Sequence, residues 1–192
     1  MKDLDLTPWL IRMSQGDEQA FQVVYEATRD HAYRLISYLA PNKEDIGDIM
    51  SEVYLELFRS LNTYDSEQNF ASWFSGLIVR QVRNWKRKEW RFFRITEKLK
   101  LSTTKSSDPA AELRLTALSD RLDLLPILQT LPLKFKEVIV LRYYQDCTLE
   151  DIAELLKIPL GTVKSRHHHA LKHLRRRFDQ QGLRKEGDGF VY

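Results

Sequence analysis

Several features that mark other protein classes are scarce in this sequence of 192 residues. It has one cysteine, Cys147, which excludes a disulfide framework within one chain and is typical of a reducing compartment. Glycine (seven) and proline (six) are few, and alternating strand-like patterns are hard to find. No apolar run approaches a membrane span, and no signal peptide is evident. We therefore expect a soluble, cytoplasmic, all-α protein with no direct membrane insertion.

Charge and catalytic motifs narrow the functional classes further. The net charge is only +3, but one segment is acidic and two are basic. Such clustering indicates a nucleic-acid partner better than the mean charge does. No glycine-rich phosphate loop, nucleophile elbow or acid–base pair is recognisable, so we expect no enzyme activity, no cofactor and no small-molecule substrate.

The segment from Thr148 to Arg177 has the pattern of a helix-turn-helix. Thr148 is a suitable N-cap, with Asp151 as its capping-box partner. Pro159 must end the first helix because proline cannot continue the backbone hydrogen bonding. A second helix is expected from about Thr162. The inward positions, at helical spacing, are Ile152, Ala153, Leu155, Leu156, Val163, Ala170 and Leu174.

The outer face of this second helix is strongly basic. No acid occurs between Leu155 and Phe178. The cationic and histidine residues of that span are Lys157, Lys164, Arg166, His167, His168, His169, Lys172, His173, Arg175, Arg176 and Arg177. A basic helix presented by a helix-turn-helix fits the major groove of DNA, where phosphates attract it and base edges are read by side chains. A solvated helix in an ordinary bundle is the alternative.

Residues 42–61 predict a helix with two distinct faces. Its buried stripe is expected to contain Ile46, Ile49, Met50, Val53, Leu57 and Phe58. Asp45, Asp48, Glu52 and Glu56 follow at steps of three, four and four, so they share another face with no local basic partner. This pattern is compatible with a solvated face and with a docking surface for a basic partner.

A long helix is expected from Phe70 into the nineties. It begins with aromatic residues, including Trp73 and Phe74, for which core packing is the simpler interpretation. It ends with cations interleaved with aromatics: Arg80, Arg83, Trp85, Lys86, Arg87, Lys88, Trp90, Arg91, Phe92, Phe93 and Arg94. Cations for phosphates and flat rings for unstacked bases suit single-stranded nucleic acid.

The remaining elements complete two helical domains. A short helix is expected after an N-cap at Thr7, and a longer one runs from Asp17 to the stop at Pro41. The Ser/Thr-rich segment 101–109 is the clearest linker, followed by a helix capped by Asp108. The predicted division is an N-terminal domain over 1–97, a linker over 98–109, a four-helix C-terminal domain over 110–182 and a frayed tail over 183–192.

Motifs in both domains resemble the bacterial sigma factors of the extracytoplasmic-function (ECF) group, within the sigma-70 family. The C-terminal half reads LP-x4-EV-x2-LRYY followed by LEDIAELLKIPLGTVKSR, which is similar to region 4. GDEQAFQVVYE, EDIGDIMSEVYLELF and F-x2-WF are similar to region 2. The resemblance implies a region 2 helical bundle and a region 4 helix-turn-helix domain, joined by a flexible linker.

The same resemblance implies a function in transcription initiation. Such a factor binds core RNA polymerase and directs it to promoters by reading the −10 and −35 elements, as duplex and as melted single strand. Catalysis then belongs to the polymerase. Many members are held inactive by an anti-sigma factor, often membrane-bound, so we expect an anti-sigma partner that can hold the chain at the membrane.

The resemblance also assigns roles to particular positions. The core-polymerase surface would contain Asp45, Asp48 and Glu52. Promoter contacts at the −10 element would come from Tyr64, Asn69, Trp73, Arg80, Arg83, Asn84 and Arg87. At the −35 element the base readers would be Lys164, Ser165, His168 and His169. Phosphate contacts there would come from Thr162, Arg166 and Arg175.

Some positions depart from the family pattern. Arg80 stands where the family usually has Asn, and Asn84 where it usually has Asp. The family often carries Leu-His-Arg at the positions of His167-His168-His169, and often Gly at Lys157. A histidine at a base-reading position offers one weak donor where arginine offers a bidentate fork, so the promoter sequence does not follow from the resemblance.

Two other functions stay open, and two further kinds of site were considered. A free-standing helix-turn-helix regulator would bind DNA without polymerase, and an adaptor would bind polymerase through the acidic face alone. His169 and His173 are one turn apart, but without an acidic or cysteine neighbour we expect no metal site. Cys147 is expected to be an inert residue rather than a redox sensor.

Overall fold

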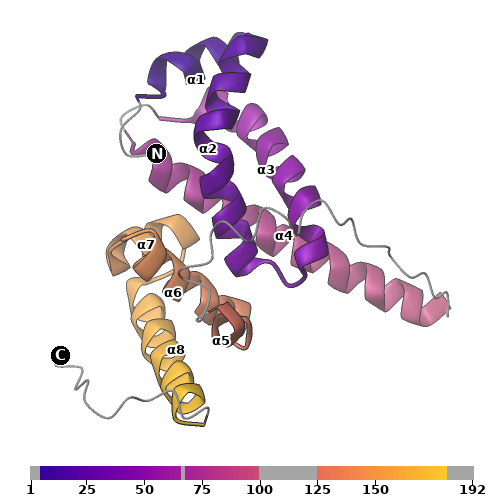
Figure 1. The fold of residues 1–192 in the computed structure, drawn as a ribbon, viewed down its shortest axis with the longest axis vertical. Coiled ribbons are helices and arrows are strands. Elements are labelled where there is room, and N and C mark those ends of the chain that lie inside the picture. The colour runs from indigo at the N-terminus through magenta and orange to yellow at the C-terminus, as the bar shows by residue number, and fades with distance from the viewer. Residues whose placement is uncertain (1–4, 66–67, 100–124, 181–192) are drawn as a thin grey trace. The chain divides into compact units, whose positions relative to one another are not determined.

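The computed structural model describes residues 5–65, 68–99 and 125–180. All regular structure within these ranges is helical, and it clusters into two compact units, one built around α1–α4 and the other around α5–α8 (Figure 1). The predicted linker from residue 100 onward, the helix expected after Asp108 and the tail over 183–192 lie outside the described residues.

The first two helices are joined by a tight turn at Gly16. The prediction that Thr7 caps the first helix was wrong. Thr7 is the first residue of helix α1 (Thr7–Ser14), and its N–H donates to Asp5 Oδ1 at 3.0 Å. Gly16 adopts φ of +87°, a conformation that glycine allows at little cost. Asp17 caps α2 (Glu18–Leu39) as predicted, since its Oδ1 accepts the N–H groups of Gln19 and Ala20.

The helix predicted over 42–61 is divided into three pieces. A 3₁₀ turn, η1 (Lys43–Asp45), leads into α3 (Ile46–Ser60), and a second 3₁₀ turn, η2 (Leu61–Thr63), follows. This tightening at both ends is common where a helix has to satisfy its terminal backbone groups. The predicted stripe of Ile46, Ile49, Val53 and Leu57 is buried.

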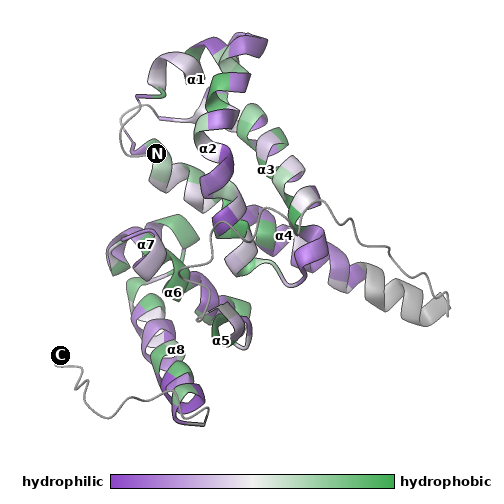
Figure 2. Ribbon diagram, viewed as in Figure 1, coloured by the Kyte–Doolittle hydropathy of each residue, from purple (hydrophilic) through white to green (hydrophobic). Residues whose placement is uncertain are grey.

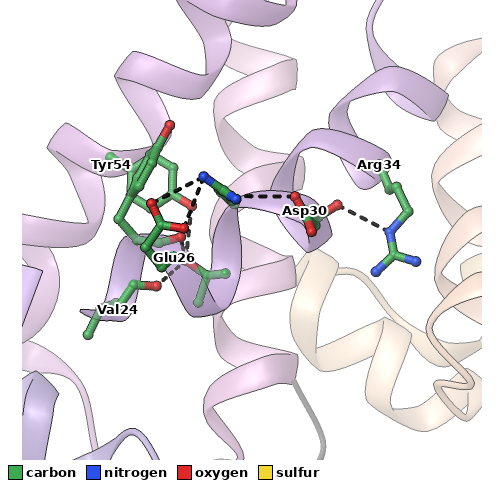
Figure 3. A network of polar contacts seen from close by, with 8 residues as sticks. Val24, Glu26, Asp30, Arg34 and Tyr54 are labelled. Atoms are coloured by element: carbon green, nitrogen blue, oxygen red, sulfur yellow. Dashed lines mark hydrogen bonds and ion pairs between the residues drawn. The ribbon is translucent and has the colours of Figure 1, made fainter. Parts of the chain in front are cut away.

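The predicted stripe is wrong at Phe58 and leaves out Tyr54, while Met50 is half-buried. Phe58 is 51% exposed, whereas Tyr54 is 7% exposed. Figure 3 shows Tyr54 lying against α2 near Val24. Its hydroxyl lies 2.9 Å from Thr28 Oγ1, which donates to the Val24 carbonyl at 2.7 Å. A buried tyrosine is stable where both its ring and its hydroxyl find partners, as here with Tyr25 at 4.8 Å between ring centroids.

Helices α2, α3 and α4 (Phe70–Leu99) pack against one another, and α1 covers α2. The buried residues shared by these helices include Leu10, Met13, Val24, Ala32, Leu35, Ile36, Leu39, Ile49, Val53, Leu57, Phe74, Ile78 and Val82. One polar contact also joins α2 to α4, between His31 Nε2 and Ser75 Oγ at 3.0 Å. Burial, with the nearby Arg34 charge, lowers the pKa of His31 to about 4.

The second unit contains α5 (Leu125–Gln129), α6 (Leu133–Tyr144), α7 (Leu149–Leu156) and α8 (Leu160–Gln180). Helices α5 and α6 both pack against α8. The buried residues of this unit include Ile127, Leu128, Leu131, Val138, Ile139, Val140, Leu141, Ile152, Val163 and Ala170. Val163 and Ala170 are two of the three inward positions predicted for the basic helix.

The predicted helix-turn-helix is confirmed in its local chemistry. Thr148 and Asp151 form the reciprocal capping box, at 2.8 and 3.0 Å. At the other end of α7, Lys157 adopts φ of +51°. The N–H of Ile158 donates to the carbonyl of Ala153 at 3.0 Å, which is the Schellman arrangement of a helix end. Helix α8 then begins one residue after Pro159.

Side chains of particular kinds are unevenly divided between the two units. All four tryptophans, Trp9, Trp73, Trp85 and Trp90, belong to the first unit.

Among the helices of the described ranges, none combines the length and apolar character that crossing a membrane requires.

Candidate functional surfaces

The acidic face of α3 is smaller than the sequence predicted. Asp48 is exposed, and Glu52 is partly exposed. Asp45 is only 6% exposed, and its Oδ2 accepts a hydrogen bond from Asn42 Nδ2 at 3.1 Å. The prediction that Asp45 shares the open face was therefore wrong, because Asp45 lies in the 3₁₀ turn that precedes α3.

A basic partner for this face comes from α4, where the sequence of α3 alone could not show it. Lys88 Nζ lies 2.9 Å from Glu52 Oε1. The Lys88 side chain is 62% exposed, so the ion pair is solvated and contributes less than about 1 kcal/mol to stability.

Exposed apolar side chains lie beside the acids on α3. Leu55 is 53% exposed, and Phe58 is 51% exposed. Leu55 follows Asp48 by seven residues, so the two lie on the same side of the helix. The open face of α3 therefore combines negative charge with apolar surface.

An aromatic cluster surrounds the start of α4. Tyr64 packs on Trp73 and Phe70 with ring centroids 4.7 and 5.8 Å apart. The Tyr64 hydroxyl donates to the Gln68 carbonyl at 2.7 Å, and Asn69 Oδ1 accepts the Ser72 N–H at 3.1 Å. The structure thus brings three predicted −10 residues, Tyr64, Asn69 and Trp73, together.

Farther along α4 the basic residues form one strip. Arg80, Asn84, Arg87 and Arg91 follow at steps of four, three and four, so they share a face. Figure 2 shows α4 becoming hydrophilic over this part. Trp90 is 59% exposed, and it lies three residues beyond Arg87. Arg91 and Trp90 were not among the residues predicted to contact the −10 element, although both belong to the stretch where cations and aromatic residues alternate.

The predicted base readers on α8 are all accessible. Lys164, Ser165, His168 and His169 are exposed. Of the predicted phosphate contacts, Arg175 is exposed, and Thr162 and Arg166 are half-buried. Lys164 with His168, and Ser165 with His169, form neighbouring strips one turn long, as expected for helical spacing.

The three consecutive histidines have different surroundings. His167 is half-buried, and its Nε2 lies 3.1 Å from the Tyr143 hydroxyl of α6, with the two rings stacked at 5.8 Å. Burial, with the Arg142 charge, lowers the pKa of His167. His169 instead packs its ring parallel to Phe135 of α6, at 6.2 Å. The structure therefore makes both His167 and His169 contacts between α6 and α8, with His169 and His168 still exposed to solvent.

Two other predicted properties can be compared with the geometry. Within the described residues, no group of three or more histidine, cysteine, aspartate or glutamate side chains is arranged to hold a metal ion. Cys147 is 6% exposed, and burial raises the pKa of its thiol to about 11. A buried thiol with a raised pKa is mostly protonated near neutral pH, which supports the prediction that Cys147 has low reactivity.

Comparison with known proteins identifies both units. Residues 24–92 match the family model of sigma-70 region 2, and residues 127–176 match that of sigma-70 region 4. The chain is similar to the ECF RNA polymerase sigma factor SigW of Bacillus subtilis (strain 168), with 26% identity over 174 residues, 86% of this chain and 92% of the relative. It is also similar to the ECF RNA polymerase sigma-E factor of Haemophilus influenzae, with 27% identity over 164 residues, 81% of this chain and 85% of the relative.

Solved structures share the fold. The sigma factor RpoE in its co-crystal structure with the anti-sigma factor NepR from Bartonella quintana matches with a TM-score of 0.65 and 17% identity, covering 83% of this chain and 96% of that chain. The structure of CnrH in complex with the cytosolic domain of CnrY matches with a TM-score of 0.61 and 17% identity, covering 90% of this chain and 96% of that chain.

These observations define a two-domain, helix-turn-helix DNA-binding protein. The chain belongs to the sigma-70 family of RNA polymerase sigma factors, in its ECF group. It directs RNA polymerase to promoters through regions 2 and 4. As in the family as a whole, the chain has no catalytic activity of its own.

Proposed function

We propose that the open face of α3 is the surface through which this sigma factor binds core RNA polymerase. Asp48 and Glu52 supply the negative charge, and Leu55 and Phe58 supply apolar area. Such a surface fits a basic partner that also offers apolar contacts. Asp45 acts indirectly in this proposal, by holding Asn42 and the turn that leads into α3.

The −10 element is bound by the first half of α4 and the loop before it. An unstacked base packs against the Tyr64–Trp73 cluster, where flat rings are available near the surface. Arg80, Asn84 and Arg87 hold the backbone from one strip of the helix, and Arg83 contacts it from the neighbouring strip. Because Asn69 already caps α4 through its side-chain oxygen, its NH₂ group supplies the two donors for DNA.

The −35 element is bound by α8 in the major groove. The observation that carries this proposal is the exposed face of α8, where Lys164, Ser165, His168 and His169 are all accessible and no acid occurs between Leu155 and Phe178. Thr162, Arg166 and Arg175 contact the phosphates on either side. A helix of this charge gains affinity from every phosphate it neutralises.

An anti-sigma factor is the regulatory partner of the proposal. Of the two similar structures, one is a sigma factor in complex with an anti-sigma factor, and the other is CnrH in complex with the cytosolic domain of CnrY. The protein acts in the cytoplasm, as is typical of its relatives, and a membrane-bound anti-sigma factor would hold it at the membrane.

Transcription by purified core polymerase on pooled genomic fragments tests the proposal as a whole. Start sites that depend on the added protein are expected, and their upstream sequences give the two promoter elements. Specific DNA binding without initiation would favour a free-standing regulator. A complex with core polymerase, but no initiation and no specific DNA binding, would favour an adaptor.

Two charge variants then assign the surfaces. Asp48→Arg is expected to weaken core binding about tenfold, which corresponds to about 1.4 kcal/mol. Lys164→Ala is expected to leave core binding unchanged and to lower promoter selectivity by about tenfold. Asp30→Arg, at a side chain that is 83% exposed, and Arg34→Ala are the matched controls on α2. Equal losses in a variant and its control would contradict the assignment.

A further inference from the structure

We propose that His169 selects, within the −35 element, a base that presents an amino group in the major groove, which is adenine or cytosine. The inference rests on the proposed placement of α8 in that groove. His169 was so far assigned only to base contacts at the −35 element; which base it prefers is new.

The backbone of α8 fixes the tautomer of the His169 imidazole. Nδ1 of His169 lies 2.7 Å from the carbonyl oxygen of Ser165, one turn earlier in α8. A carbonyl oxygen only accepts hydrogen bonds, so Nδ1 must carry the hydrogen. A neutral imidazole has a single N–H, and therefore Nε2 carries a lone pair and acts as an acceptor.

The second step concerns the orientation of the ring. The His169 ring lies parallel to Phe135, with an interplanar angle of 10° and 6.2 Å between centroids. The ring also meets that of His168 edge to face, with 5.7 Å between centroids. The Ser165 hydroxyl lies 3.5 Å from Nδ1, near the same end of the ring. These contacts hold the imidazole in one rotamer, which reduces the entropy lost when it binds a base.

The third step concerns what the ring leaves available. His169 is exposed, and no residue in the described part of the chain forms a hydrogen bond with Nε2. The nitrogen that remains for a partner outside the protein is thus the acceptor. His168 differs, because no backbone bond fixes its tautomer within the described residues, and it can present either nitrogen.

The pattern of groups in the major groove then decides the base. Adenine N6 and cytosine N4 are the only amino donors there, whereas guanine presents N7 and O6 and thymine presents O4. A lone pair at Nε2 accepts from adenine or cytosine, and it is repelled by the acceptors of guanine and thymine. An arginine at this position would donate only, and would prefer guanine.

A promoter library tests this inference directly. Holoenzyme assembled from core polymerase and the full chain is mixed, in mildly alkaline buffer where imidazoles are neutral, with promoters randomised across the −35 element. Bound or transcribed sequences are counted for the natural chain, His169→Ala and His169→Arg. We expect one position enriched about fivefold in adenine or cytosine in the natural chain, unselective in His169→Ala, and enriched in guanine in His169→Arg.

A variant at Phe135 separates orientation from contact. Phe135→Leu keeps an apolar residue but removes the stacked ring, so the same base should stay preferred with a smaller enrichment. Guanine or thymine at that position in the natural chain, or an unchanged base profile in His169→Ala, would overturn the inference while −35 recognition itself stands. A library with no enrichment at any position would instead overturn the proposed role of α8, and the inference with it.

Discussion

The turn of the helix-turn-helix offers a prediction with a clear sign: Lys157→Gly should stabilise the region 4 domain. Lys157 has φ of +51°, in the left-handed region that non-glycine residues rarely adopt. The turn needs this conformation, because the Ile158 N–H reaches back to the Ala153 carbonyl at 3.0 Å. A glycine supplies it without a clash between Cβ and the backbone.

The expected magnitude is a difference between two terms. A left-handed residue with a Cβ costs about 1–2 kcal/mol. Glycine returns about 0.4–1 kcal/mol of this through the greater freedom of the unfolded chain. The net stabilisation is therefore about 1 kcal/mol, which corresponds to about a fivefold change in the folding equilibrium.

Hydrogen exchange of the full chain, read on peptides from α7 and α8, measures this change in place. Protection in Lys157→Gly should rise by about fivefold where exchange reports unfolding of the domain. Lys157→Ala removes the charge but keeps the Cβ, so it should show little gain. Glu154→Gly, in the right-handed interior of α7, should lower protection by a similar factor.

Alanine and glycine variants at Lys157 that behave alike would contradict a backbone origin of the effect. Equal gains would mean that relief of cationic repulsion, and not backbone conformation, is responsible. A loss of protection in Lys157→Gly would show that the lysine side chain stabilises the turn by more than its backbone costs.

Three further predictions follow from single contacts. Thr148→Ala removes the hydroxyl that accepts the Asp151 N–H and should lower region 4 stability by about 1 kcal/mol, seen as faster exchange in α7. Burial raises the pKa of the Cys147 thiol from 9.0 to about 11. Near neutral pH, this thiol should therefore react with iodoacetamide about two orders of magnitude more slowly in the native chain than in the denatured chain. A fast reaction of the native chain would contradict the burial of Cys147. Burial lowers the pKa of His31 from 6.5 to about 4, so protonation favours the unfolded chain, and region 2 stability should fall as the pH drops through that interval. His31→Gln should flatten this dependence in acid unfolding curves.

Local chemistry made much of the fold predictable from the sequence. The capping box at Thr148, the cap at Asp17, the stop at Pro41 and the turn before Leu160 depend on residues within a few positions of one another. The acid-free face of α8 is likewise a property of one helix. These features could be read without knowing any tertiary contact.

Two features that the spacing of residues did not show depend on partners far away in the sequence. Periodicity could not distinguish Tyr54 from Phe58, because both lie at the edge of the buried stripe of α3. The choice was made by Thr28, 26 residues earlier, whose hydroxyl donates to the Val24 carbonyl and lies 2.9 Å from the Tyr54 hydroxyl. Glu52 similarly finds its basic partner, Lys88, 36 residues later. Spacing within one helix carries no information about such contacts.

The division of tryptophans between the two units has a practical consequence for spectroscopy. Trp9, Trp73, Trp85 and Trp90 all belong to the region 2 unit, so the tryptophan fluorescence of the unmodified chain, excited selectively, reports on that unit. Trp90, at 59% exposure on the basic part of α4, is the fluorophore best placed for quenching by an added ligand. Tryptophan fluorescence does not report on region 4, but its four histidines on α8 offer imidazole proton resonances as a second reporter, to be distinguished from that of His31 in region 2. One sample can therefore give two separate spectroscopic channels, one for each domain.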